Sequence, residues 1–193
     1  MKKSDKFISS VFRKEILDMS AYKIADASGL IKLDAMENPY SWPVEITNQW
    51  LESLRSCELN RYPDSTAKKL TATIKNLDDL LIDFDVLLGN GSDEIIQLLL
   101  MSLPAQSTVL TPEPGFVMYR QIAQSLGLHY QGIPLQANSF DLDMPAMRTA
   151  IKENQPAIIF IAYPNNPTGN LFDRDDIQEI LQLAPGLVVL DEA

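Results

Sequence analysis

The chain has 193 residues, of which 26 are acidic and 16 basic, and its formal net charge is −10. Because nucleic acids and anionic membranes repel a surface with that excess of negative charge, we expect neither as the main partner. Hydrophobic residues make up 46% of the sequence and charged residues 22%, a composition that favours a globular domain over a disordered chain.

The first 35 residues show no strong pattern of a buried core, and we expect them to form an N-terminal arm or part of a small domain. A helix is expected between residues 12 and 22, and a short strand over residues 31–35. The basic start at residues 1–6 is followed by no long apolar stretch, unlike a secretory signal peptide. No run approaches the ~18 apolar residues that a membrane-spanning helix requires, so no membrane partner is expected.

Two amphipathic helices are predicted next, over residues 44–57 and 65–77, because apolar residues recur there at helical spacing. The segment 60–64 between them is a polar turn, and Ser65 is expected to cap the second helix. Cys57 is the single cysteine. The chain can therefore form no internal disulfide, which suits the reducing cytoplasm where we expect this protein.

A glycine-rich turn over residues 89–94 follows a short apolar run, 86–88, that predicts a strand. The helix that begins in this turn is apolar nearly all round, which indicates a buried helix, and Ser92 is available to cap it. Backbone N–H groups in the first turn of a helix lack internal partners and carry positive potential, so a phosphate fits this place. Asp93 and Glu94 would then have to turn away or accept hydrogen bonds from backbone donors. Glu94 also stands where the dinucleotide-binding fingerprint requires glycine, which disfavours a generic nucleotide-binding domain.

The middle of the chain alternates strands with helices. Residues 107–110 predict a strand that the following prolines end. Phe116 and Tyr119 open the next helix, where an aromatic ring could belong to the core or stack on a flat ligand. His129 starts another strand after a helix-ending glycine, and we expect its role to be structural. As the only histidine, it excludes a metal site built on two or three histidines within this chain, and no metal is expected.

Two further apolar runs, 157–162 and 187–190, predict strands buried on both faces, and a helix is expected between them over 173–183. The first run is followed by Tyr163–Asn170, whose prolines, asparagines and glycine break both strand and helix. The second is followed by Asp191–Ala193. Strands that alternate with helices, including one over 145–154, predict a three-layer α/β fold with a mostly parallel sheet. Ligands bind at the carboxyl ends of the strands in such sheets, so these loops are expected to form a site.

Six short sequence blocks follow one another along the chain: Leu33–Pro39, Asn60–Asp64, Gly89–Glu94, Pro114–Phe116, Tyr163–Gly169 and Asp191–Ala193. In sequence and order they resemble those of the pyridoxal-phosphate-dependent aminotransferases of fold type I and, within them, of the histidinol-phosphate aminotransferases. Asn-Pro-Thr-Gly and Asp-Glu-Ala are typical of the broad family. Asn-Arg-Tyr-Pro-Asp and Gly-Ser-Asp-Glu are typical of the histidinol-phosphate branch and of its relative, threonine-phosphate decarboxylase.

The resemblance implies that pyridoxal 5'-phosphate is the cofactor, and it gives the matching residues their roles. Asp191 would keep the ring nitrogen protonated, Asn166 would donate a hydrogen bond to the ring hydroxyl oxygen, and Phe116 would stack on the ring, where many relatives have tyrosine. Ser92 and Asp93 would bind the phosphate at the start of a helix.

The resemblance further implies a homodimer, in which Tyr62 would reach the phosphate of the cofactor in the neighbouring subunit. Glu37 and Asn38 would line the end of the site that receives the substrate. Met36 and Tyr163 replace asparagines that are common in relatives. Neither replacement touches a cofactor role, but both could alter contacts with the substrate.

The implied reaction moves an amino group from L-histidinol phosphate to 2-oxoglutarate in histidine biosynthesis, giving imidazole acetol phosphate and L-glutamate. The alternatives are threonine-phosphate decarboxylase, another class I or II aminotransferase, and a non-catalytic remnant of the fold. Relatives hold the cofactor through a lysine that lies beyond the Asp-Glu-Ala block, where this sequence ends. We therefore expect residues 36–193 to be the first, incomplete part of the large cofactor-binding domain. That part alone is expected to lack a catalytic residue, to be inactive and to fold poorly.

Overall fold

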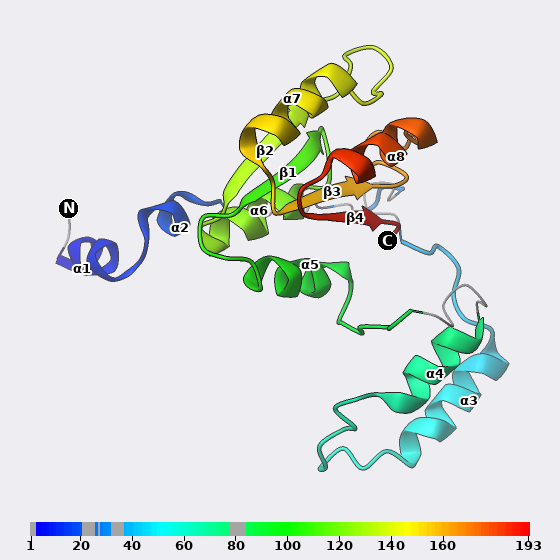
Figure 1. Ribbon diagram of the computed structural model, residues 1–193. Coiled ribbons are helices and arrows are strands. Elements are labelled where there is room, and N and C mark those ends of the chain that lie inside the picture. Colours follow the sequence, from blue (N-terminus) through cyan, green and yellow to red (C-terminus); the bar gives the residue numbers. More distant parts are fainter. Residues whose placement is uncertain (1–2, 21–25, 27, 32–36, 78–83) are drawn as a thin grey trace. The chain divides into compact units, whose positions relative to one another are not determined.

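The computed structural model describes residues 3–20, 26, 28–31, 37–77 and 84–193 (Figure 1). The chain divides into two compact units. One is formed by residues 1–20 together with 87–193, and the other by residues 21–86.

The first unit is built on a four-stranded sheet with the order β2-β1-β3-β4. All of its pairings are parallel, so the carboxyl ends of the strands meet at one edge. We call this edge, with the loops that follow Glu113, Ala162 and Asp191, the rim. The mostly parallel sheet predicted from the sequence is confirmed. The strands are β1 Thr108–Glu113, β2 His129–Pro134, β3 Ile158–Ala162 and β4 Leu187–Asp191.

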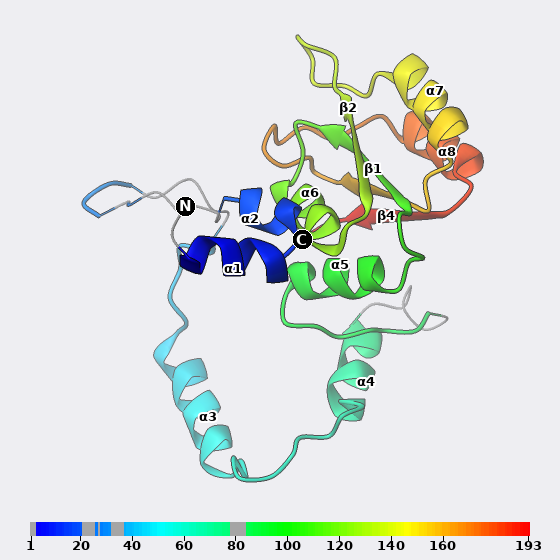
Figure 2. The same ribbon diagram turned by 90° about the vertical axis from the view of Figure 1, so that its left-hand side faces the viewer.

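Helices cover both faces of this sheet, which confirms the predicted three layers (Figures 1 and 2). Helices α7 and α8 share one hydrophobic core with the sheet, and α5 and α6 share a second core on the opposite face. The helices are α5 Ser92–Met101, α6 Val117–Leu126, α7 Met144–Asn154 and α8 Arg174–Leu183.

Strand β3 shows how the sequence produces two cores. Ile159 and Ile161 belong to the core under α7 and α8, whereas Ile158 and Phe160 belong to the core under α5 and α6. Successive side chains of a strand point to opposite faces, so an unbroken apolar run is stable only when both faces are covered. Each of these four side chains is 0% exposed.

The strand expected over residues 86–88 is wrong. Leu87 is 66% exposed, and no strand among the described residues precedes Thr108. An apolar run becomes a strand only where a neighbouring strand offers hydrogen bonds, and none of the four strands pairs with this segment. The segment leads instead into α5.

Strand β1 is longer than predicted, because it continues through Pro112 to Glu113. Its pairing with β3 involves Val109 and Leu110, whereas its pairing with β2 runs on to the end of the strand. A proline is tolerated in a strand where a neighbour does not need the missing N–H, and Pro112 lies beyond the stretch that pairs on both sides.

The N-terminal arm consists of two helices, α1 Lys3–Val11 and α2 Lys14–Asp18, instead of the single helix expected between residues 12 and 22. The guanidinium of Arg13, between them, donates a hydrogen bond to the backbone oxygen of Ser125 in α6. The strand expected over residues 31–35 lies almost wholly outside the described residues.

The second unit confirms the two helices predicted for it, although the second begins later than expected. Its cap is Asp64 and not Ser65. The Asp64 carboxylate accepts hydrogen bonds from the backbone N–H groups of Thr66 and Lys68, at 3.0 and 3.2 Å. One carboxylate therefore satisfies two donors at this helix start. The helices are α3 Val44–Arg55 and α4 Lys68–Leu77.

Candidate functional site

The loop after β3 is fixed to the loop after β1 by Asn165, which is 3% exposed. The Asn165 side-chain amide donates to the backbone oxygen of Pro114 at 3.0 Å and to Thr168 Oγ1 at 2.7 Å. Its backbone N–H donates to the carbonyl of Asn170, and its carbonyl accepts from the N–H of Gly169. These bonds close the loop on itself and join two parts of the rim. The sequence analysis missed Asn165, although its place beside Asn166 in a proline-broken loop was a possible signal.

Asn166 lies next to this anchor and is half-buried. Among the described residues its side-chain amide makes no hydrogen bond, so its donor is available to a ligand at the rim. The N–H of Tyr163, at the start of the same loop, donates to the backbone oxygen of Asp191 at 2.8 Å. The loop is thereby held to the end of β4 as well.

Asp191 lies at the last position of β4 and takes a hydrogen bond from α6. The hydroxyl of Tyr119 donates to Asp191 Oδ2 at 2.6 Å, and the backbone N–H of Ala193 donates to Asp191 Oδ1 at 3.0 Å. Tyr119 is 1% exposed, whereas Asp191 is only half-buried. The buried Tyr119 therefore holds the Asp191 carboxylate from the core side, while part of the carboxylate remains accessible at the rim.

Three aromatic rings fix the geometry behind this carboxylate. The ring of Tyr119 stacks on Phe160 with centroids 4.7 Å apart, and it meets Phe116 edge to face at 5.4 Å. Phe116 is half-buried, and it lines a hollow of about 510 Å³ together with Pro167 of the loop after β3. Phe116 thus contacts Tyr119 and shares a hollow with the loop that carries Asn166.

Helix α5 starts at Ser92 with no side-chain cap, so Ser92 is not the cap that the sequence suggested. The preceding Gly91 has φ +83°, a left-handed conformation that favours glycine. The Glu94 carboxylate turns back and accepts from the backbone N–H of Asn90 at 2.6 Å, which matches the expectation that it bonds to a backbone donor. Asp93 is exposed, and its charge acts on the Tyr119 hydroxyl, so the start of α5 lies close to the Tyr119–Asp191 pair.

A second polar cluster lies on β1 and β2. The hydroxyl of Tyr130 donates to Glu113 Oε1 at 2.7 Å and accepts from Thr111 at 2.6 Å. The guanidinium of Arg120 forms an ion pair with Glu113 and lies over the Tyr130 ring, 5.1 Å from its centroid. Burial raises the pKa of Tyr130 to about 12, against the opposing effect of the Thr111 hydroxyl. This cluster satisfies its own charges and provides a half-buried tyrosine–carboxylate pair outside the proposed cofactor roles.

The buried hydroxyl of Tyr119 makes stability depend on pH. Burial, and then the hydrogen bond to Asp191, raise the pKa of the Tyr119 hydroxyl well above its ordinary value of about 10. Above about pH 10, the ordinary pKa of tyrosine, the hydroxyl loses its proton in the unfolded chain but keeps it in the folded chain. The free energy of unfolding is therefore expected to fall as pH rises. The expected slope is about 1.4 kcal/mol per pH unit for Tyr119. Urea unfolding of the wild type and of Tyr119→Phe from about pH 9 to pH 11 checks this, because the slope should be smaller in the variant. Equal slopes would contradict the shift.

Substitution of Asn165 by alanine is expected to lower the free energy of unfolding by about 2–3 kcal/mol, because it removes the two hydrogen bonds that this buried side-chain amide donates to Pro114 and Thr168. Urea denaturation measures the loss. Asn138→Ala, at an exposed position, is the matched control and should change stability by less than about 0.5 kcal/mol. Equal stabilities of the two variants would show that Asn165 does not anchor the loop.

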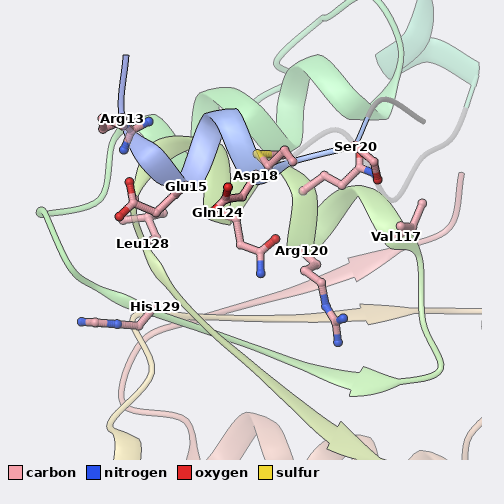
Figure 3. A pocket seen from close by; sticks show the side chains of 12 residues that line it. Arg13, Glu15, Asp18, Ser20, Val117, Arg120, Gln124, Leu128 and His129 are labelled. Carbon is pink, nitrogen blue, oxygen red and sulfur yellow. The ribbon is translucent and has the colours of Figure 1, made fainter. Parts of the chain in front are cut away.

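A hollow of about 800 Å³ lies between α2 and α6 and offers a competing location for a site (Figure 3). The charged side chains that line it do not point toward one another: Arg13 and His129 lie toward the left of the view, and the Arg120 guanidinium points down from near its middle. Arg13 already binds the backbone of α6, and Arg120 is paired with Glu113. Because its charged groups do not converge, we place the candidate site at the rim. His129 is exposed at the start of β2, where the sequence placed it.

Three residues with predicted roles lie in the second unit and are described there by themselves. Tyr62 is fully exposed, and Asn38 Oδ1 accepts a hydrogen bond from the backbone N–H of Tyr40 at 3.0 Å. Glu37 is likewise exposed. The structure therefore brings together Asp191, Phe116 and the start of α5, whereas the roles of Tyr62, Glu37 and Asn38 stay predictions.

Two further observations concern the described residues alone. In that part of the chain, no three His, Cys, Asp or Glu side chains gather as a metal site would require. No helix there has the length and apolar character needed to cross a membrane.

Comparison with known proteins identifies relatives over nearly the whole chain. The protein is 53% identical to histidinol-phosphate aminotransferase 2 of Nitrosococcus oceani over 188 residues, which are 96% of this chain and 52% of that relative. It is 48% identical to the histidinol-phosphate aminotransferase of Thiocapsa roseopersicina over 185 residues, covering 95% of this chain and 98% of that one. The chain thus spans about half the length of the first of these relatives.

Solved structures show the same fold. The histidinol-phosphate aminotransferase of Clostridium acetobutylicum matches 83% of this chain and 46% of its own, with 27% identity and a TM-score of 0.70. The enzyme of that name from Sinorhizobium meliloti, solved in complex with pyridoxal-5'-phosphate, matches 95% of this chain and 51% of its own, with 17% identity and a TM-score of 0.74. The sheet and its helices are therefore those of a fold type I aminotransferase. The family model for class I and II aminotransferases matches residues 28–193. The chain belongs to the class I and II aminotransferase family.

Proposed function

We propose that the complete protein transfers an amino group between L-histidinol phosphate and 2-oxoglutarate, as a histidinol-phosphate aminotransferase of histidine biosynthesis in the cytoplasm. Relatives with that name at 48% and 53% identity support the choice of substrate. The observation that carries the proposal is the Asp191 carboxylate, which is held by a buried tyrosine whose ring contacts the ring of Phe116.

The donors and acceptors at the rim fit pyridoxal 5'-phosphate. A protonated ring nitrogen needs a carboxylate, and Asp191 provides one that is partly accessible and already held in place. A ring hydroxyl oxygen needs a donor, and Asn166 has an amide that no described residue occupies. A phosphate needs backbone N–H groups, and Ser92 and Asp93 begin a helix without a side-chain cap. A flat ring needs an aromatic face, and Phe116 is half-buried.

Each of these residues has a separate role in binding and orienting the cofactor. The cofactor, when bound, acts as an electron sink for the bonds around the amino-bearing carbon. Asp191 would hold a proton at the ring nitrogen, and Asn166 would donate a hydrogen bond to the ring hydroxyl oxygen. Asn165 keeps Asn166 in position because it fixes both ends of the loop. The carboxylate of Asp93 is exposed to solvent, and its backbone N–H in the first turn of α5 would be available to the phosphate.

The remaining roles concern the complete protein. Tyr62 is proposed to reach the phosphate bound by the neighbouring subunit of a homodimer. Glu37 and Asn38 are proposed to line the substrate end of the site.

The test is a transamination assay of the purified full-length protein. Formation of L-glutamate from L-histidinol phosphate and 2-oxoglutarate, dependent on added pyridoxal 5'-phosphate, is the expected result. Release of carbon dioxide from threonine phosphate would instead favour the related decarboxylase. Cofactor binding with neither reaction would favour another aminotransferase, and no cofactor binding would overturn the proposal.

A further inference from the structure

The start of α6 brings together two aromatic side chains that serve the rim in different ways. Phe116 is the residue just before the helix, and Tyr119 lies in its first turn. The Phe116 ring meets the Tyr119 ring edge to face, and the Tyr119 hydroxyl reaches across to Asp191 Oδ2 at 2.6 Å. The Tyr119 side chain therefore contacts both Asp191 and Phe116, the two residues that the proposed function places against the cofactor ring.

We propose that Tyr119 is a positioning residue, whose hydroxyl keeps the Asp191 carboxylate aimed at the ring nitrogen while its ring sets the position of Phe116. This inference rests on the proposed function, because it assigns Tyr119 a task through Asp191. Tyr119 itself stays behind these two residues, since it is 1% exposed.

The packing around the Tyr119 ring fixes the direction in which its hydroxyl points. The ring stacks on Phe160 with an angle of 14° between the planes, and Phe160 is itself 0% exposed. Interiors packed in this way allow little rotation of a ring. Because the direction of the hydroxyl is fixed, the position of the carboxylate that accepts from it is fixed as well.

The surroundings of the hydroxyl keep it a donor. Burial, then the hydrogen bond to Asp191 and the nearby negative charges of Asp191 and Asp93, raise the pKa of Tyr119. The hydroxyl therefore keeps its proton and donates a hydrogen bond to the Asp191 carboxylate.

Removal of the hydroxyl alone tests this role in the full-length protein. Tyr119→Phe is expected to raise the dissociation constant of pyridoxal 5'-phosphate from the apoprotein, and to lower kcat, each by about tenfold or more, because a hydrogen bond to a charged group is lost. Tyr130→Phe is the matched control, since it removes another hydroxyl that donates to a carboxylate. It is expected to change both quantities less than about twofold. Equal effects of the two substitutions would overturn the proposal.

A double substitution separates positioning from a merely structural role. If Tyr119 acts through Asp191, adding Tyr119→Phe to Asp191→Asn should raise the dissociation constant of the cofactor by less than about threefold, because the partner is already lost. A structural role would cost about tenfold in both backgrounds. The same penalty in both backgrounds would therefore refute positioning.

A second measurement covers the case in which Tyr119→Phe fails to fold. 3-Fluorotyrosine at position 119 of the full-length protein keeps the ring and the hydroxyl, and its ¹⁹F resonance should shift when pyridoxal 5'-phosphate is added to the apoprotein. The same label at position 130 should shift less. An unmoved resonance at position 119 would refute the proposal.

The experiments also distinguish this inference from the proposed function. If the wild type binds no pyridoxal 5'-phosphate, the proposed function fails, and the role of Tyr119 fails with it. If the wild type binds the cofactor and Asp191→Asn weakens binding, while Tyr119→Phe behaves as Tyr130→Phe does, only the role of Tyr119 fails.

Discussion

Asp191→Asn in the full-length protein is expected to lower kcat for transamination by about 10²- to 10³-fold. A carboxylate in contact with a protonated nitrogen favours the protonated state by about one to three pKa units, and each unit is a factor of ten in the population of that state. The asparagine amide has nearly the same shape as the carboxylate but no charge, so most of the stabilisation of the protonated ring nitrogen would be lost. The dissociation constant of pyridoxal 5'-phosphate should rise in the same variant, which gives a readout independent of turnover.

Glu192→Gln is the control for this substitution. Glu192 is the next residue along the chain and is exposed, so the change removes the same charge from the same region. We expect it to alter kcat by less than about threefold, because an exposed charge is screened by solvent. If both variants lost activity equally, the effect would come from the general loss of negative charge, and the role of Asp191 would be wrong.

Phe160→Ala is expected to lower the free energy of unfolding by about 3–5 kcal/mol. The side chain is 0% exposed, lies in the core under α5 and α6, and stacks on Tyr119. Its removal costs the burial of an aromatic ring and leaves a cavity that the surrounding side chains fill only in part. A typical domain is stable by only about 5–15 kcal/mol, so the variant should be close to unfolding at moderate temperature.

Urea denaturation of the full-length protein, followed by circular dichroism, measures this change. The control is Leu171→Ala, at a side chain that is 60% exposed, and it should stay within about 0.5 kcal/mol of the wild type. A loss of less than about 1 kcal/mol in Phe160→Ala would mean that the neighbouring side chains collapse into the space, contrary to a close-packed core.

Sequence reasoning succeeded where a local pattern decides the structure. The run from residue 157 to 162 has no charge and sends alternate residues to two covered faces, so it could only become a central strand. The prolines and glycine that follow it could only make a loop. Because parallel strands share one carboxyl edge, this local reasoning was enough to bring Asn166 and Asp191 to the same rim.

Sequence reasoning failed where a distant partner decides the structure. Residues 86–88 have the composition of a strand, but no described strand pairs with them. Asp64 and Ser65 are both good caps, and the choice between them depends on a loop conformation that spacing does not reveal. The bond from Tyr119 to Asp191 joins residues 72 positions apart, so no local pattern points to it.

The parallel sheet has a consequence for how fast the protein assembles. Val109 in β1 pairs with Ile158 in β3, and α6, β2 and α7 lie between these residues along the chain. Closing so long a loop costs entropy before any pairing is gained, so chains dominated by such distant contacts fold slowly. The rim draws on the ends of three strands and is complete only after this closure. A newly made chain is therefore expected to acquire its helices well before it acquires affinity for a cofactor.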